Sequence, residues 1–243
     1  MTSIKISCSS LCVEENYDHD GHDALIVFDS FCLTIQKFNL QQVLEWSSTC
    51  NENLPPHIWQ IDESGGKMAI FENELLVDQF FRQEIDIYNL NNGTLITSIS
   101  IENHFLYTSV CTCTAMAINE YTRELIICET YYTAGRIEGP YKKLQFFRKD
   151  LHNKWKHVKT VDKRAKFHCE EPLCMIWDRT AKHLLFGNWH SIFAFSLDGE
   201  LVSTISPQGF QGSSRCFGCH SMALNDETGE LVVLGNQWVL IFQ

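Results

Sequence analysis

One short motif in the sequence has residue types and spacing that belong to known cofactor chemistry. Cys216-Phe217-Gly218-Cys219-His220 has the C-x-x-C-H spacing at which haem c is attached. That chemistry uses both thiols in thioether bonds and the histidine as an axial ligand of iron. The first residues show no signal-peptide pattern, and the repeat described below places His220 at the start of a strand. We therefore interpret the motif as a strand start and expect no cofactor.

A second set of candidate ligands shares a position in a repeat. Three residues before the first apolar residue of each repeat unit, four of five units carry a thiol or a carboxylate. With the adjacent histidine, the set is Cys8, Cys113, Glu171, Cys219 and His220. These side chains suit zinc, so a zinc site is one hypothesis. We prefer the alternative that the cysteines pack as small apolar residues at strand starts.

An acidic segment offers a second metal hypothesis. Asp18, Asp20 and Asp23 lie close to Gly21, which resembles a calcium-binding loop. The segment lacks the glutamate that closes an EF-hand loop, and no helix pattern flanks it. We prefer a solvated loop and keep calcium as the alternative. Because the sequence contains no arguable catalytic triad, phosphate loop or pair of catalytic carboxylates, a non-catalytic role is favoured over an enzyme.

The elements that must position these residues are strands arranged in five repeat units. Each unit has a short apolar run, a polar turn, a second apolar run and an alternating strand that ends in an aromatic residue. The terminal aromatics are Phe38, Tyr88, Phe147, Phe195 and Phe242. Repeats of roughly 50 residues built only from strands indicate a β-propeller. We predict an all-β fold, a single domain over 1–243, with five four-stranded antiparallel blades and six as the alternative.

Two further strands are predicted where the repeat is incomplete. A fourth strand follows the third in four units, and in the first unit it is predicted at Val43–Ser48. The last unit ends after its third strand, so we expect Thr2–Ser7 to complete it.

The units resemble NHL repeats. The best match runs through Ser221–Asn225, Gly229–Val233 and Val239–Phe242, and the next through Leu75–Asp78 and Ile85–Tyr88. The Asn-His-Leu signature itself is absent, so the resemblance is to a propeller superfamily more than to one subfamily. It implies a protein-interaction platform in most cases. In others it implies RNA binding on a basic face, or a calcium-dependent lactonase or lyase.

The composition of the chain disfavours nucleic acids as partners. The net charge of −11 and the sequence pI of ≈ 5.3 disfavour binding to a phosphate backbone. The basic stretch Tyr141–Lys166 is interpreted as the solvated outer edge of a blade, with RNA binding as the alternative. No transmembrane run is present, and without an export signal the 11 cysteines are expected to be reduced thiols. We expect a cytoplasmic monomer with no membrane attachment.

The insertion Tyr131–Tyr141 is the candidate binding surface. It lengthens one repeat unit and contains Tyr131, Tyr132, Arg136 and Tyr141, and Tyr and Arg are enriched in interface hot spots. The sequence therefore predicts a protein-interaction scaffold. The alternatives are a calcium-dependent lactonase or lyase, and an RNA-binding propeller.

Overall fold

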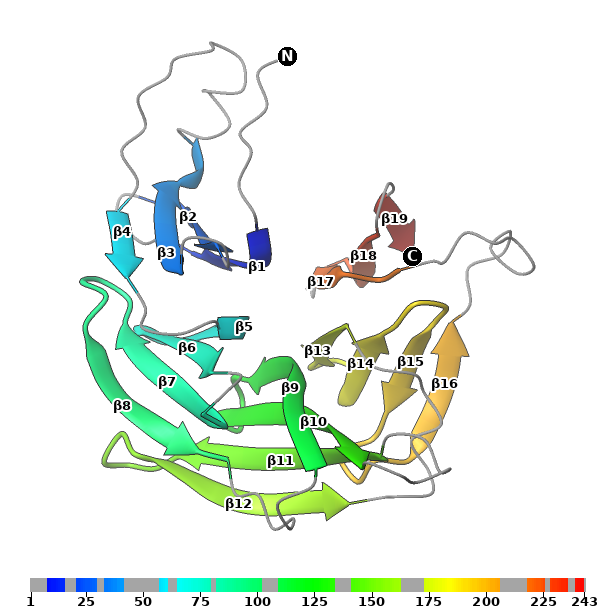
Figure 1. Cartoon of the computed structure of the whole chain (residues 1–243). Helices are drawn as coiled ribbons and strands as arrows, with labels where there is room; N and C mark the ends of the chain where they lie inside the picture. The colour runs from blue at the N-terminus through cyan, green and yellow to red at the C-terminus, as the bar shows by residue number, and fades with distance from the viewer. Residues whose placement is uncertain are drawn as a thin grey trace. The chain divides into compact units, whose positions relative to one another are not determined.

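The repeat units fold into antiparallel sheets in the computed structural model of the chain (Figure 1). The structure describes residues 8–15, 21–29, 33–41, 57–60, 65–79, 82–101, 109–133, 141–162, 173–205, 218–225, 228–235 and 239–242. The five repeat units fall into two compact units of the chain, Met1–Glu102 and Asn103–Gln243, called the first and second unit. The fold is an all-β propeller with five blades, as predicted. That the two units make a single domain stays a prediction.

The first unit holds two four-stranded blades. Blade 1 consists of β1 (Cys8–Glu14), β2 (Ala24–Asp29), β3 (Thr34–Asn39) and β4 (His57–Gln60), and blade 2 of β5 (Gly65–Phe71), β6 (Glu74–Gln79), β7 (Glu84–Asn89) and β8 (Leu95–Ser100). In each blade the strands pair in chain order. Val43–Ser48 and Thr2–Ser7 lie outside the described residues. The strand that pairs with β3 is β4, with Trp59 opposite Ile35.

One apolar cluster contains buried residues of both blades of the first unit. Phe28 of blade 1 and Val77 of blade 2 are at most 3% exposed and belong to one cluster. Trp59 packs against the same cluster, which explains why His57–Gln60 forms the outer strand. Burying an apolar side chain of this size contributes about 1.5–3 kcal/mol. The interior between these two sheets therefore stabilises the first unit.

The second unit holds three blades. Blade 3 consists of β9 (Ser109–Asn119), β10 (Glu124–Thr133), β11 (Tyr141–Lys149) and β12 (Trp155–Asp162), blade 4 of β13 (Cys174–Asp178), β14 (His183–Gly187), β15 (Ile192–Phe195) and β16 (Leu201–Ile205), and blade 5 of β17 (Ser221–Asn225), β18 (Glu230–Leu234) and β19 (Val239–Phe242). Two apolar clusters hold them together. Phe146 of blade 3 packs with Phe186 of blade 4, and Leu185 of blade 4 packs with Val233 of blade 5.

Cys8, Gly65 and Cys113 each lie three residues before the first apolar residue of their repeat unit, and each stands next to a β-bulge. The pairing shifts between Cys8 and Ser10 in β1 and between Gly65 and Met68 in β5. In blade 3 the shift lies where Cys113 pairs with Glu129. A bulge bends the strand and redirects its side chains, and it is common next to functional sites. The three residues therefore have the same surroundings in their blades, each next to a shift in the pairing.

Candidate functional site

Within the individual sheets, most of the described candidate residues lie at the same edge. Since neighbouring strands are antiparallel, each first strand begins at the edge where the second strand ends. We call this the entry edge. In four blades a polar residue that is at most 8% exposed lies at the end of the second strand, within its last five residues or directly after it. These residues are Asp29, Gln79, Glu129 and Asn188. The sequence signal was a polar residue at the end of each second apolar run, and the sequence reasoning missed it.

Glu129 lies in a buried polar network in blade 3. Its Oε2 accepts hydrogen bonds from the Tyr131 hydroxyl at 2.8 Å and from Gln145 Nε2 at 2.6 Å. The Lys143 ammonium lies 5.8 Å from the centroid of the Tyr131 ring. A buried carboxylate needs such donors, because an unpaired charge in the interior is costly. Glu129 therefore has a structural role in joining β10 to β11.

The same network includes Tyr131, at the first end of the insertion. Tyr131 is 0% exposed and pairs with Tyr141 across β10 and β11, while Tyr132 lies within β10. The two ends of the insertion are therefore strand, because Tyr and Thr favour a pleated strand and Glu129 satisfies the buried hydroxyl. Tyr131 is a core residue and not part of a surface. Arg136 lies outside the described residues, and partner binding by this segment stays a prediction.

The turn between β14 and β15 holds a tryptophan at the entry edge. Asn188 Oδ1 accepts hydrogen bonds from the N–H groups of His190 and Ser191, both at 2.8 Å. Asn188 N–H in turn donates to Ser191 O at 3.0 Å. From the segment before β17, the Gly218 N–H donates to Trp189 O at 2.9 Å. The turn is thus fixed by its own side chain and by the next blade.

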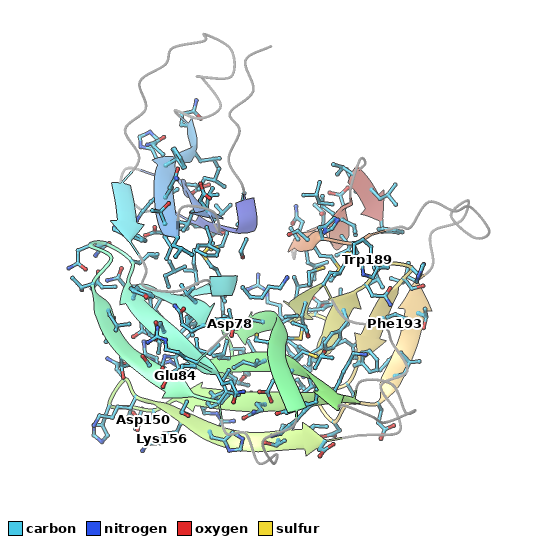
Figure 2. The ribbon with its side chains drawn as sticks, in the orientation of Figure 1. Asp78, Glu84, Asp150, Lys156, Trp189 and Phe193 are labelled. Carbon is cyan, nitrogen blue, oxygen red and sulfur yellow. The ribbon has the colours of Figure 1, made fainter. Side chains whose placement is uncertain are left out.

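The Trp189 ring is exposed although its backbone is held. Its exposure is 36%, and Figure 2 labels it together with Phe193 of β15. The rings of Trp189 and His220 meet edge to face, with centroids 5.6 Å apart and an interplanar angle of 86°. Edge-to-face contact is a favourable geometry for aromatic rings. The result is an exposed aromatic pair built from blades 4 and 5.

Two thiols lie where blades 4 and 5 meet at the entry edge. The Sγ atoms of Cys174 and Cys219 are 3.4 Å apart, and Cys174 Sγ is 3.5 Å from Cys219 O. Cys219 is 0% exposed, whereas Cys174 is partly exposed. The hydrogen bond with Cys174, together with burial, raises the pKa of the Cys219 thiol well above its usual range. A buried thiol in this contact does not suit the thioether role that the C-x-x-C-H spacing would require.

The proposed zinc ligands are only partly within the described structure. Cys113 Sγ lies 3.7 Å from Ala115 O and Cys219 Sγ 4.0 Å from Ser221 O, the same contact in two blades. Among the described residues, no three His, Cys, Asp or Glu side chains gather as a metal site. The Cys8 side chain and Glu171 lie outside the described residues. The zinc and calcium hypotheses therefore stay predictions.

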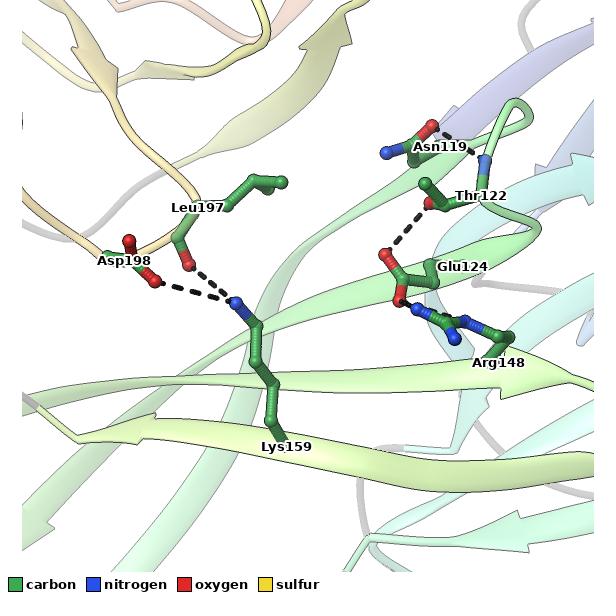
Figure 3. Close-up of polar contacts among 7 residues, drawn as sticks. All are labelled: Asn119, Thr122, Glu124, Arg148, Lys159, Leu197 and Asp198. Carbon is green, nitrogen blue, oxygen red and sulfur yellow. Dashed lines mark hydrogen bonds and ion pairs between the residues drawn. The ribbon is translucent and has the colours of Figure 1, made fainter.

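The opposite edge of the sheets carries polar residues that build turns. Asn119 Oδ1 accepts from Thr122 N–H at 3.2 Å, and the Thr122 hydroxyl donates to Glu124 at 2.8 Å (Figure 3). Blade 5 repeats the pattern with Asn225 and Thr228 at 3.2 Å. These asparagines share a register position, and their side chains cap β-turns. Turn formation therefore accounts for them without a ligand.

The basic stretch is more buried than the sequence predicted. Lys142, Lys143 and Lys149 of β11 are at most 6% exposed, so the expectation of a solvated edge is wrong for them. A third strand lies inside its blade, where long lysine stems can be covered. On the outer strand β12, Lys159 is exposed and its ammonium contacts Leu197 O at 3.2 Å and Asp198 at 3.7 Å (Figure 3).

Comparisons with known proteins bear on the fold. No protein-family model and no curated protein matches the sequence. Hydrazine synthase of Kuenenia stuttgartiensis matches in structure with a TM-score of 0.59 and 10% identity, over 100% of this chain and 85% of that one. The periplasmic gluconolactonase of Pseudomonas aeruginosa matches with a TM-score of 0.55 and 10% identity, over 84% of this chain and 59% of that one.

A third solved structure, a functionally unknown protein from Desulfotomaculum acetoxidans, matches with a TM-score of 0.51 and 14% identity, over 99% of this chain and 84% of that one. At such identities the likeness concerns the fold alone. Within the described ranges, no helix has the length and apolar character needed to cross a membrane. The comparisons therefore support a β-propeller.

Proposed function

We propose that this chain is an NHL-like propeller that serves as a protein-interaction scaffold, with a binding surface at the entry edge of blades 4 and 5. The observation that carries the proposal is Trp189, an exposed aromatic on a turn that is fixed from two sides. Tryptophan is enriched in interface hot spots. A turn whose backbone is already held in place loses less conformational entropy on binding. His220 extends the aromatic surface beside it.

The insertion of blade 3 belongs to the same proposed surface. It connects the second strand to the third, as the Trp189 turn does in blade 4. Loops at one edge of a rigid scaffold are the usual carriers of propeller function. Residues 134–140 would add contacts, with Tyr131 and Tyr141 anchoring the ends in the sheet.

A lactonase-type or lyase-type enzyme is the second candidate. The observation that favours it is the buried polar residue at or near the end of the second strand in four blades. Two of those residues already have partners, however. Glu129 binds Tyr131 and Gln145, and Asn188 caps its own turn. Gln79 is the better candidate ligand, since its amide has no hydrogen-bond partner among the described residues and is 0% exposed. One buried amide without a partner among the described residues is weaker support for an enzyme than the exposed Trp189 is for a scaffold.

The RNA-binding alternative has less support. Buried Lys142, Lys143 and Lys149 add no charge to an exposed face. On β12, Lys156 forms an ion pair with Asp150 at 2.8 Å. An RNA surface would need a row of accessible cations, and the net charge of −11 opposes one.

The test compares two exposed aromatics at opposite edges. Trp189→Ala should retain the fold and lose specific partners in quantitative affinity enrichment. Tyr121→Ala is the matched control, since Tyr121 is 93% exposed in the turn between β9 and β10, at the other edge. For a purified partner, the Trp189 variant should bind about 30-fold more weakly, as expected for a hot spot. An identical set and affinity of partners for all three proteins would refute the proposal.

A second arm separates the insertion from the tryptophan. Residues 134–140 are replaced by a short Gly-Ser turn, while the paired ends of β10 and β11 are kept. Weaker binding in both this variant and Trp189→Ala would define one continuous surface. Turnover of a lactone by the wild type that is lost in Gln79→Ala would instead favour the enzyme.

A further inference from the structure

The thiols of Cys174 and Cys219 are placed for a covalent link between two blades. Cys174 begins β13, the first strand of blade 4, and Cys219 lies two residues before β17, the first strand of blade 5. Although the residues are 45 positions apart in sequence, their Sγ atoms are 3.4 Å apart. Cys174 is held in β13, and the backbone of Cys219 is held by a hydrogen bond from its N–H to Asn188 O, so both thiols are positioned at this contact.

The backbone beneath the thiols is shaped to receive them. Gly187 ends β14 and pairs with Cys174. A Cβ at this glycine would lie 2.2 Å from Cys219 Sγ and 2.8 Å from Cys174 Sγ, too close for either sulfur. Both sulfurs therefore occupy the space that a side chain at position 187 would fill. This is an observation independent of the distance between the sulfurs, and it indicates a site where two thiols meet.

We propose that Cys174 and Cys219 form a reversible disulfide that joins blade 4 to blade 5, with a peroxide or a low-molecular-weight disulfide as the oxidant. Cys174 reacts first because it is partly exposed, whereas Cys219 is 0% exposed. The proposal goes beyond partner binding by Trp189 and holds whether or not Trp189 binds anything.

The reaction balances with hydrogen peroxide. The Cys174 thiolate attacks one peroxide oxygen, the O–O bond breaks, and a sulfenic acid and hydroxide result. The Cys219 sulfur then attacks the sulfenic sulfur, the S–O bond breaks, and the oxygen leaves as water with the proton of the Cys219 thiol. Overall, two thiols and one peroxide give one disulfide and two waters, and two electrons pass from sulfur to oxygen.

The link would act on a segment that supports the Trp189 turn. Cys219 N–H donates to Asn188 O at 3.0 Å, and the neighbouring Gly218 N–H donates to Trp189 O at 2.9 Å. Cross-linking Cys219 to β13 would hold these two hydrogen bonds in place. Oxidation would therefore reduce local opening of the turn.

The experiment maps disulfides in the full chain after oxidation. Purified wild type is treated with hydrogen peroxide, remaining thiols are alkylated, and non-reduced digests are analysed by mass spectrometry. The expected product is a cross-linked peptide pair containing Cys174 and Cys219, which dithiothreitol removes. Cys174→Ser and Cys219→Ser should abolish it. Cys113→Ser, at the register position equivalent to Cys219 in blade 3, should leave it unchanged.

A second measurement does not depend on variants that fold. The melting temperature of oxidised wild type should exceed that of reduced wild type by about 5 °C or more, because the cross-link restricts the unfolded chain. Three outcomes overturn the proposal: both thiols still alkylated after oxidation, a disulfide between Cys219 and Cys216, which stands three positions earlier in the sequence, or over-oxidation of Cys174 without a cross-link.

Discussion

Ser98 donates a hydrogen bond of 2.6 Å to Asp86 Oδ1, joining β8 to β7 at a carboxylate that is fully buried. Arg82 binds the other oxygen at 2.7 Å, and the Tyr88 hydroxyl lies 3.3 Å from it. Burying a carboxylate is costly unless hydrogen-bond donors satisfy it, and Asp86 has three. Asp86 therefore connects the turn before β7, the third strand and the outer strand of blade 2.

Asp86→Ala is expected to destabilise the first unit by about 2–4 kcal/mol, because it leaves buried donors without an acceptor. Ser98→Ala removes one donor and should cost about 1 kcal/mol. Urea denaturation of both variants measures the difference. Equal losses of unfolding free energy for the two substitutions would contradict the conclusion that Asp86 connects these three segments.

Two glycines with the same backbone conformation should differ strongly on substitution by alanine. Gly93 has φ +69° and a Cβ there would lie 2.3 Å from the Trp59 ring, whereas Gly229 has φ +73° with nothing within 4 Å. Gly229→Ala should cost about 1 kcal/mol, from the left-handed backbone alone. Gly93→Ala should cost about 1–3 kcal/mol more, because it also displaces Trp59. Thermal unfolding of the two variants tests this, and equal losses would count against the close packing of Trp59.

Gly187→Ala is expected to destabilise the chain by about 1–3 kcal/mol, because the new methyl group overlaps Cys219 Sγ. Removing that sulfur in Gly187→Ala/Cys219→Ala should recover part of the loss. A double-mutant cycle by chemical denaturation should then give a coupling of about 1 kcal/mol or more. Strictly additive effects would mean that the glycine and the thiol do not share this space.

The turn that contains Asp150 gives a pH-dependent prediction. A hydrogen bond from Lys156, helped by the N–H groups of Lys154 and His152, holds the pKa of Asp150 well below its usual range (Figure 2). A carboxylate whose pKa is lowered in the folded state stabilises it above the unfolded pKa, about 3.9. That stabilisation is lost as pH falls toward the folded value.

The stability gap between wild type and Asp150→Asn should therefore be largest near neutral pH and shrink as the pH falls below about 4. Lys156→Met removes the main donor, so the stability difference between wild type and Lys156→Met should also shrink as the pH falls. Urea midpoints measured between neutral and acidic pH provide the comparison. Curves for wild type and Asp150→Asn that stay parallel throughout would show that the ion pair at 2.8 Å does not stabilise the turn.

The sequence alone determined most of the strands and their grouping, although the outer strand of blade 1 is His57–Gln60 and not the predicted Val43–Ser48. The predicted terminal aromatics Tyr88 and Phe195 lie within one residue of the ends of β7 (Glu84–Asn89) and β15 (Ile192–Phe195). The repeat also identified Cys8, Gly65 and Cys113 as equivalent positions, which lie next to bulges. Local patterns suffice here because strand periodicity follows directly from the two faces of a sheet.

Only the tertiary structure decided what the side chains do. Tyr131 reads as a surface aromatic in the sequence, and it is buried because Glu129 satisfies its hydroxyl. Cys174 lies in no motif, yet it meets Cys219 of the last unit of the chain. Trp189 stands in no motif, and its ring is exposed on a turn whose backbone is held by hydrogen bonds from two segments. Such contacts depend on how neighbouring sheets pack, and a one-dimensional pattern does not specify which residues distant in the chain face one another.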